Sequence, residues 1–168
     1  MAAFQAWTTA NFPSCKLVLG VPSYGYISTS HSERLRTRSV FSSNRQTRQS
    51  NSIKVIDEDG GSDSQVQFRQ LVKQGALVRS FPSHENNLSS FSSSGGFERR
   101  WDTCSATPFL RSASSGQIIT YDDPESLGMK AAFARQVGML GVNMFDIHGD
   151  IHECDLIDSI RKSLGLVI

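Results

Sequence analysis

Hydrophobic residues follow the most regular pattern towards the end of the chain. Gln117–Tyr121 and Leu140–Phe145 are short apolar runs typical of strands. Between them, Asp122-Asp-Pro-Glu-Ser suits the start of a helix, because a carboxylate caps the first turn and proline fits it. A second helix is expected from about Glu153. The alternation of strand and helix predicts an α/β fold. The two predicted helices carry apolar faces made of Leu127, Ala131, Ala134 and Val137, and of Leu156, Ile157, Ile160 and Leu164.

The beginning of the chain shows a shorter version of the same pattern. Phe4 and Trp7 form one apolar edge of a predicted helix, and Pro13 ends it. The continuous run Leu17-Val-Leu is typical of a strand that is buried on both faces in a parallel sheet. Residues 1–27 are therefore predicted to form a helix, a short connection and a strand.

The middle of the chain is more polar. Ile53–Ile56 alternates weakly and predicts a strand, and Asp63–Gln74 has the spacing of a helix that Gly75 ends. Ser89–Gly96 is a low-complexity patch rich in serine. We expect an inserted subdomain here, with a loosely ordered block over 28–100 beside a small core of two or three strands. Segment 28–52 is crowded with Ser, Thr and Gln and also contains Arg34, Arg36, Arg38, Arg45 and Arg48.

The length and net charge of the chain limit the kinds of binding partner that we expect. The chain has 168 residues and a net charge of +1, so it is short for a complete (β/α)₈ barrel of about 250 residues and gives no general affinity for polyanions. The arginine-rich segment is interpreted as a solvated loop rather than an RNA-binding arm, and no nucleic-acid partner is expected. No apolar run approaches the ~20 residues that span a bilayer, and the N-terminus lacks a signal-peptide pattern.

Neither a metal nor a cofactor is expected. Cys15, Cys104 and Cys154 are widely spaced without a C-x-x-C motif, which favours buried free thiols over a zinc site or a disulfide framework. Potential ligands occur at every second position near the end of the last strand, which is a ligand-like spacing, but a polar rim is the preferred interpretation. These four residues are Asp146, His148, Asp150 and His152.

Several segments, in order along the chain, resemble glycoside hydrolase family 18, the chitinases and chitinase-like lectins. The resemblance implies a partial (β/α)₈ TIM barrel that contains strands seven and eight, with an inserted α+β subdomain between them. It assigns residues 1–27 and 117–168 to the barrel and 28–116 to the insertion. The matching segments are Lys16-Leu-Val-Leu-Gly-Val-Pro-Ser-Tyr-Gly, Trp101-Asp102, Pro108-Phe-Leu, Ile119-Thr-Tyr-Asp-Asp-Pro-Glu-Ser-Leu, Gly141-Val-Asn-Met-Phe-Asp-Ile-His-Gly-Asp and Leu156 to Leu164.

The resemblance implies binding of chitin or N-acetylglucosamine oligomers at the C-terminal ends of barrel strands. Aromatic rings there suit the apolar C–H face of a sugar. The family cleaves chitin by a substrate-assisted retaining mechanism that needs a glutamate ending an Asp-x-x-Asp-x-Asp-x-Glu run. That run is absent, as is the Met-x-Tyr-Asp of strand six, so no catalytic residue is predicted. The substrate-binding residues implied by the resemblance are Tyr24, Trp101, Asp102, Phe145 and Asp146.

Two positions depart from the family pattern. Phe145 stands where well-known members carry a tryptophan, and Tyr26 stands where many carry an arginine. Two functional hypotheses stay open. The chain is either the C-terminal part of an extracellular chitinase, completed by a missing N-terminal barrel half, or an inactive chitinase-like lectin. A fragment that does not fold stably is a third possibility, because a barrel piece exposes strand edges.

Overall fold

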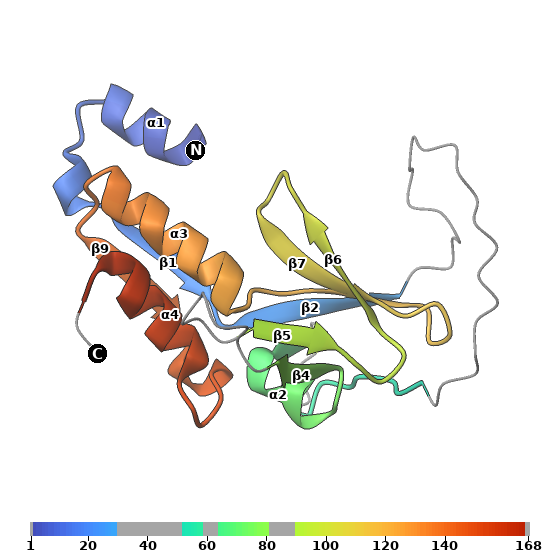
Figure 1. The fold of residues 1–168 in the computed structure, drawn as a ribbon. Coiled ribbons are helices and arrows are strands. Elements are labelled where there is room, and N and C mark those ends of the chain that lie inside the picture. Colours follow the sequence, from blue (N-terminus) through green and yellow to red (C-terminus); the bar gives the residue numbers. More distant parts are fainter. Residues whose placement is uncertain (1, 30–51, 59–63, 81–89, 167–168) are drawn as a thin grey trace.

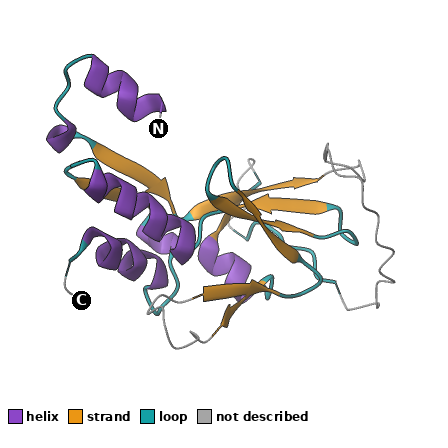
Figure 2. Ribbon diagram, turned by 45° about the horizontal axis from the view of Figure 1, so that its top comes forward, coloured by secondary structure: helices purple, strands orange, loops and turns teal. Residues whose placement is uncertain are grey.

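The structure is a computed structural model that describes residues 2–29, 52–58, 64–80 and 90–166. Most helices lie at one end of the molecule and most strands at the other (Figures 1 and 2). The helices are α1 (Ala2–Thr9), α2 (Phe68–Lys73), α3 (Pro124–Gln136) and α4 (Asp155–Leu164), with 3₁₀ turns η1 (Ser14–Lys16) and η2 (Ile147–Gly149). The strands are β1 (Val18–Pro22), β2 (Tyr24–Thr29), β3 (Gln65–Gln67), β4 (Leu77–Ser80), β5 (Ser90–Ser93), β6 (Glu98–Asp102), β7 (Thr107–Arg111), β8 (Gln117–Thr120) and β9 (Gly141–Phe145).

The two ends of the sequence meet in a parallel pair of strands. β1 runs beside β9 with Val18 opposite Gly141 and Pro22 opposite Phe145. Helices α3 and α4 cover one face of this pair (Figure 1). The prediction that Leu17-Val-Leu is buried on both faces is wrong, because Val18 is 49% exposed and only one face has a helical cover.

Local signals explain why α3 begins and ends where it does. The Asp123 side chain accepts a hydrogen bond from Ser126 N at 3.0 Å, while Ser126 Oγ accepts one from Asp123 N at 2.9 Å. This capping box satisfies two N–H groups that a helix start otherwise leaves without a partner. Gly138 has a φ of 69°, which only glycine adopts readily, and it turns the chain out of the helix. The predicted helix start is confirmed.

The second large unit is a five-stranded sheet in the order β3-β2-β8-β7-β6. β2 continues almost directly from β1 and pairs antiparallel with β8, with Ile27 opposite Ile119. β4 and β5 form a separate antiparallel hairpin that lies near α2 (Figure 1). The parallel pair agrees with the expected α/β core of two or three strands, but the expectation of a loosely ordered block over 28–100 is wrong where the structure describes it, because that block contributes β3, β4 and β5. The chain leaves the parallel pair through β2 and returns to it through β8 and α3.

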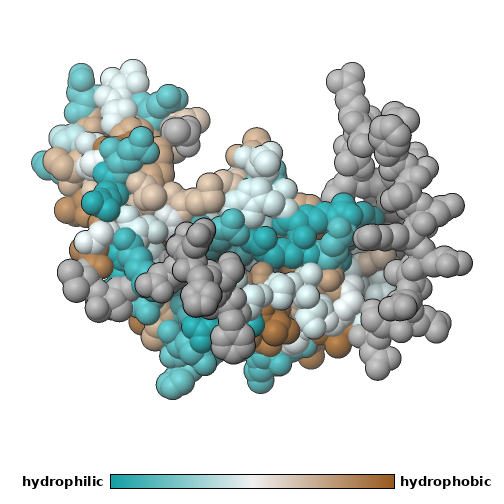
Figure 3. Space-filling model, in the orientation of Figure 1, coloured by the Kyte–Doolittle hydropathy of each residue, from teal (hydrophilic) through white to brown (hydrophobic). Residues whose placement is uncertain are grey.

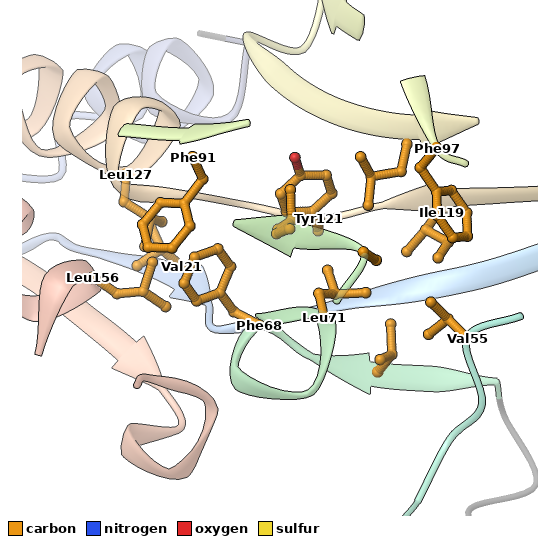
Figure 4. Close-up of a cluster of buried hydrophobic side chains, with 14 of the residues drawn as sticks. Val21, Val55, Phe68, Leu71, Phe91, Phe97, Ile119, Tyr121, Leu127 and Leu156 are labelled. Atoms are coloured by element: carbon orange, nitrogen blue, oxygen red, sulfur yellow. The ribbon is translucent and has the colours of Figure 1, made fainter. Parts of the chain in front are cut away.

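One hydrophobic core joins the two units. Val21, Leu127 and Leu156 from the parallel pair and its helices gather with Phe68 and Phe91 (Figure 4). Phe68 and Phe91 pack edge-to-face, with their ring centroids 5.0 Å apart. The core continues beneath the five-stranded sheet through buried residues that include Val55, Leu71, Phe97, Leu110 and Ile119.

In the middle block one predicted element is wrong, and another begins later than expected. Ile53–Ile56 is not a strand, because side-chain amides rather than a neighbouring strand bind its backbone. Gln117 Oε1 accepts from Val55 N at 3.0 Å and Gln117 Nε2 donates to Val55 O at 2.8 Å. Gln74 bridges Ile56 N and O in the same way, at 2.9 and 2.8 Å. The helix predicted from Asp63 begins only at Phe68, because Gln65–Gln67 is strand β3 and pairs with β2.

Two further expectations are wrong. Part of the low-complexity patch forms strand β5, which pairs with β4. Phe91 is the buried residue of this strand, and serines flank it. All three cysteines are exposed rather than buried, because Cys15, Cys104 and Cys154 lie in turns and at helix ends.

The predictions for the arginine-rich segment 28–52 fall mostly outside the described residues, and all five of its arginines lie outside them.

Within the described part, no helix has both the length and the apolar character needed to cross a membrane. On the face shown in Figure 3, the coloured surface of the strand-rich half is mostly hydrophilic, with hydrophobic residues in separate patches.

Candidate functional site

The ends of β1 and β9 are tied together by Ser23. Ser23 N donates to Phe145 O at 3.0 Å, and Asp146 N donates to Ser23 Oγ at 2.9 Å. Ser23 Oγ in turn donates to Asp146 O, and Phe68 N donates to Ser23 O at 2.9 Å. A buried serine therefore connects both strand ends and α2. The side chains that follow each strand are held close to one another at this point.

Tyr24 follows the end of β1, and Phe145 and Asp146 lie at the end of β9, so all three belong to the carboxyl ends of neighbouring parallel strands. The pKa of Tyr24 is raised, first by burial, then by Tyr26 and by the nearby charge of Asp146. Phe145 is 66% exposed, so its ring is available to a ligand. Asp146 caps η2, because its Oδ1 accepts from Gly149 N at 3.1 Å.

A cavity of about 630 Å³ lies between α2 and the loop that follows β9. This volume falls within the ~300–1,000 Å³ typical of small-molecule pockets. The wall combines charged and apolar side chains, and two of its charged residues, Lys73 and Glu58, form an ion pair at 2.7 Å. The cavity lining on the β9 side begins at Ile147, two residues after Phe145. Lining residues include Arg69, Val72, Lys73, Ile147, His148 and His152.

A smaller hollow of about 210 Å³ lies on the five-stranded sheet beside the same junction. Tyr24 and Tyr26 form one side, with their ring centroids 5.8 Å apart and their planes at 88°. Asp122 also lines it, but Lys130 Nζ holds its two oxygens at 2.6 and 2.7 Å. This carboxylate is engaged in a structural ion pair, so we assign it no catalytic role.

Trp101 and Asp102 point to opposite faces of the sheet, because neighbouring residues of a strand alternate. Trp101 lies opposite Pro108, on the face of the buried Leu110, and Arg99 stacks over its ring at 5.5 Å. Asp102 lies opposite Thr107, which lines the 210 Å³ hollow. The structure thus places Asp102 at the border of this hollow and Trp101 on the other face.

The Asp102 carboxylate is already engaged in its own turn. It accepts from Cys104 N at 2.9 Å and from Ser105 Oγ at 2.9 Å. These bonds, first that of Cys104 and then that of Ser105, lower the pKa of Asp102. Because the pKa is lower than in the unfolded chain, the stability that Asp102 contributes is present above its unfolded pKa. It is lost as the pH falls through the folded pKa.

Ser105→Ala is expected to raise the pKa of Asp102 towards its ordinary value without restoring it fully, because the Cys104 N–H bond remains. The midpoint is measured from the carboxyl carbon shift of Asp102 during an NMR pH titration. An unchanged midpoint in Ser105→Ala would contradict the hydrogen bond as a cause of the shift.

The four residues with ligand-like spacing do not form a metal site in the described part of the chain, where no group of three or more His, Cys, Asp or Glu side chains is placed to hold an ion. Asp150 instead caps α4, because its Oδ1 accepts from Leu156 N at 3.1 Å and its Oδ2 from Ile157 N at 3.0 Å. Burial raises the pKa of Asp150 despite these hydrogen bonds.

Comparison with known proteins decides the family. The model of the glycosyl hydrolases family 18 matches residues 1–150. The chain belongs to glycoside hydrolase family 18. Among curated family relatives, it is 26% identical to a chitinase-like effector of Moniliophthora roreri over 180 residues, which cover 98% of this chain and 41% of that protein.

Solved structures of family 18 proteins agree with this assignment. A chitinase from Rhizomucor miehei superimposes with a TM-score of 0.66 at 25% identity, covering 96% of this chain and 42% of that one. Human YKL-39, described as a pseudo-chitinase with retained chitooligosaccharide binding, superimposes with a TM-score of 0.66 at 17% identity, covering 97% of this chain and 39% of that one. The chain thus spans about two fifths of these relatives, which include both chitinases and pseudo-chitinases.

Sequence reasoning missed the residues that α2 contributes to the larger cavity. Arg69 and Lys73 lie in a segment outside the family resemblance, and the helix was predicted to start too early. Thr107 and Thr120 were missed for another reason: nothing along the sequence shows that β7 and β8 bring them to the edge of one hollow. Only the pairing of the strands reveals it.

Proposed function

We propose that this chain binds oligomers of β-1,4-linked N-acetylglucosamine at the junction of β1 and β9. The observation that carries the proposal is that Tyr24, Phe145 and Asp146 lie at the carboxyl ends of the paired parallel strands β1 and β9. A cavity of about 630 Å³, lined from Ile147 onward, follows the same strand end. An exposed phenyl ring stacks on the apolar C–H face of a sugar, while carboxylate and hydroxyl groups accept and donate to its hydroxyls. The 630 Å³ cavity receives the further sugar units of the oligomer.

The proposed architecture is a partial (β/α)₈ barrel in which β1 and β9 are strands seven and eight. On this view residues 1–27 and 117–168 are barrel segments, and 28–116 is the inserted α+β subdomain. Support comes from the parallel pairing of β1 with β9 and from α3 and α4 on one face of the pair. In the described residues neither strand has a second neighbour, so each has an edge that a further barrel strand can pair with.

The chain by itself is proposed to bind without cleaving. Cleavage in this family needs a positioned glutamic acid to protonate the glycosidic oxygen, and the sequence lacks the motif that carries it. Release of shorter oligomers from chitotetraose by the purified chain would contradict this. If the chain functions within a longer chitinase, an N-terminal barrel half supplies the acid, and the whole protein acts on chitin outside the cell. If it acts alone, it is a chitin-binding lectin.

The binding proposal predicts retention of the purified chain on chitin beads. Phe145→Ala is expected to weaken binding about three- to tenfold, since stacking on one ring contributes roughly 0.5–1.5 kcal/mol. Folding should be unaffected, because the ring is 66% exposed. The matched control is Leu140→Ala, which removes a 71% exposed side chain just before the opposite end of β9 and should bind like the wild type. A wild-type chain that passes through the beads unretained would rule the proposal out.

A further inference from the structure

The larger cavity has two walls whose backbones are fixed to the same residue. Phe68, the first residue of α2, donates its N–H to Ser23 O at 2.9 Å. Gly149, the last residue of η2, packs so closely that a Cβ atom there would lie 2.5 Å from the same carbonyl oxygen. Arg69 directly follows Phe68, His148 directly precedes Gly149, and both side chains line the cavity of about 630 Å³. A cation from one wall and an imidazole from the other therefore share one cavity with a well-anchored backbone.

Most of the charge in the lining is already engaged. Lys73 and Glu58 pair with each other at 2.7 Å, so their charges cancel. The Asp150 carboxylate is buried and accepts three backbone N–H bonds around the start of α4. Arg69 is exposed, and no carboxylate pairs with it in the part of the chain that the structure describes. Among these residues, the lining thus keeps one guanidinium without a counter-charge.

The polar groups that remain suit an oxyanion. A guanidinium presents its N–H donors in a planar fork that matches the oxygens of a phosphate or sulfate group. His148 and His152 add ring N–H donors to the same lining, and both side chains are exposed. An uncharged ligand leaves the charge of Arg69 uncompensated, whereas a tetrahedral oxyanion compensates it and has several oxygens for these separate donors.

The cavity is far larger than a single oxyanion. Its volume of about 630 Å³ lies in the range of about 300–1,000 Å³ that is typical of small-molecule pockets. Val72, Ile147 and Ile151 supply apolar surface in the same lining, and Ile147 is 70% exposed. The cavity therefore combines donors for a charged group with apolar surface for a body that carries this group.

We propose that this cavity binds a phosphate or sulfate group carried on a small molecule with an apolar ring, with Arg69 as the principal donor and His148 and His152 as further donors. The site goes beyond the proposed function, because it needs neither a sugar nor the ring of Phe145. Since the proposed function places further sugar units in the same cavity, the anion and a long oligomer are expected to exclude each other.

The test is an NMR titration of the full chain with phenyl phosphate, inorganic phosphate and phenol, each compared with sodium chloride at the same ionic strength. Phenyl phosphate should shift the backbone amide signals of residues 69–73 and 147–152, and phenol should not. Arg69→Ala is expected to weaken phenyl phosphate binding about tenfold or more, because charge-assisted hydrogen bonds are lost. Arg69→Lys keeps the charge but not the fork, so its affinity should lie between those of Arg69→Ala and the wild type.

The control is Arg100→Ala, which removes the same charge from an exposed side chain of β6, outside the cavity lining. It should bind phenyl phosphate like the wild type, and all variants should melt like the wild type because both arginines are exposed.

Three results decide the proposal. Signals that move no further than with chloride, or equal affinity of Arg69→Ala and wild type, overturn the anion site. Inorganic phosphate that binds as tightly as phenyl phosphate overturns the bound ring and shows a site for the free anion. None of these measurements depends on retention on chitin beads, so failure of the anion site and failure of the proposed function are distinguishable.

Discussion

Replacing Gly149 with alanine is expected to lower the melting temperature by about 6–12 °C. A Cβ atom at this position would lie 2.5 Å from both the Cβ atom and the carbonyl oxygen of Ser23, and still closer to Ser23 Oγ. Ser23 cannot move away cheaply, because it is buried and hydrogen-bonded to Phe145, Asp146 and Phe68. Overpacking of this kind costs about 3 kcal/mol, and each kcal/mol shifts the midpoint of a chain of this size by about 2–4 °C.

Gly141→Ala is the matched control for this prediction. It is also a glycine at the β1–β9 pair, but a Cβ atom there would meet nothing within 4 Å. Its melting temperature should equal the wild type or exceed it slightly, because alanine reduces the freedom of the unfolded chain. The midpoints are measured by circular dichroism. If Gly149→Ala melts like Gly141→Ala, the close approach of the two segments is refuted.

Arg99→Ala is expected to lower the melting temperature by about 5–10 °C. Arg99 Nη2 lies 2.8 Å from Asp123 Oδ2 and 2.9 Å from Glu125 Oε2, and Asp123 is only 2% exposed. Burial disfavours the charged guanidinium, but the hydrogen bond and charge of Asp123 outweigh it, so the pKa of Arg99 is raised. Removing Arg99 leaves a buried carboxylate without its cation, which costs about 2–3 kcal/mol, below the largest measured values because Ser126 N still donates to Asp123.

The neighbouring Arg100 provides the control, because Arg100→Ala removes the same type of side chain from the same strand. Its ion pair with Glu98 at 2.8 Å joins two exposed side chains, and such pairs contribute little. Thermal melts at low and high salt separate the two cases further, since screening weakens exposed pairs more than buried ones. Equal melting temperatures for Arg99→Ala and Arg100→Ala would show that the Arg99–Asp123 pair does not hold β6 to the start of α3.

The regular ends of the chain could be predicted from sequence, whereas the middle could not. In α3 and α4 the apolar residues recur at helical spacing, and caps such as Asp123 and Gly138 mark the boundaries. In the middle block the core residues occur singly among polar ones, as Val66 and Phe91 do. Their burial depends on strand pairings between distant segments, such as β2 with β8, which no local pattern contains.

In the candidate site too, the positions of some residues could be predicted from the sequence and those of others could not. Tyr24 and Phe145 were expected together because parallel strands end at one edge, and the structure brings them there. Trp101 and Asp102 were assigned as a pair from resemblance alone, yet strand alternation sends them to opposite faces. Strand direction could therefore be used to place residues from distant segments at one edge, whereas adjacency in sequence could not place Trp101 and Asp102 on one face.

The glutamine bridges to residues 52–58 have a consequence for how this protein can evolve. A primary amide offers a donor and an acceptor much as a peptide group does, so Gln74 and Gln117 serve as substitutes for a neighbouring strand. These hydrogen bonds involve only backbone atoms of residues 52–58, so they do not depend on which side chains those residues carry. Mutations at exposed positions such as Lys54 can therefore accumulate without displacing the segment, whereas a change at either glutamine would remove two of the hydrogen bonds that hold its backbone.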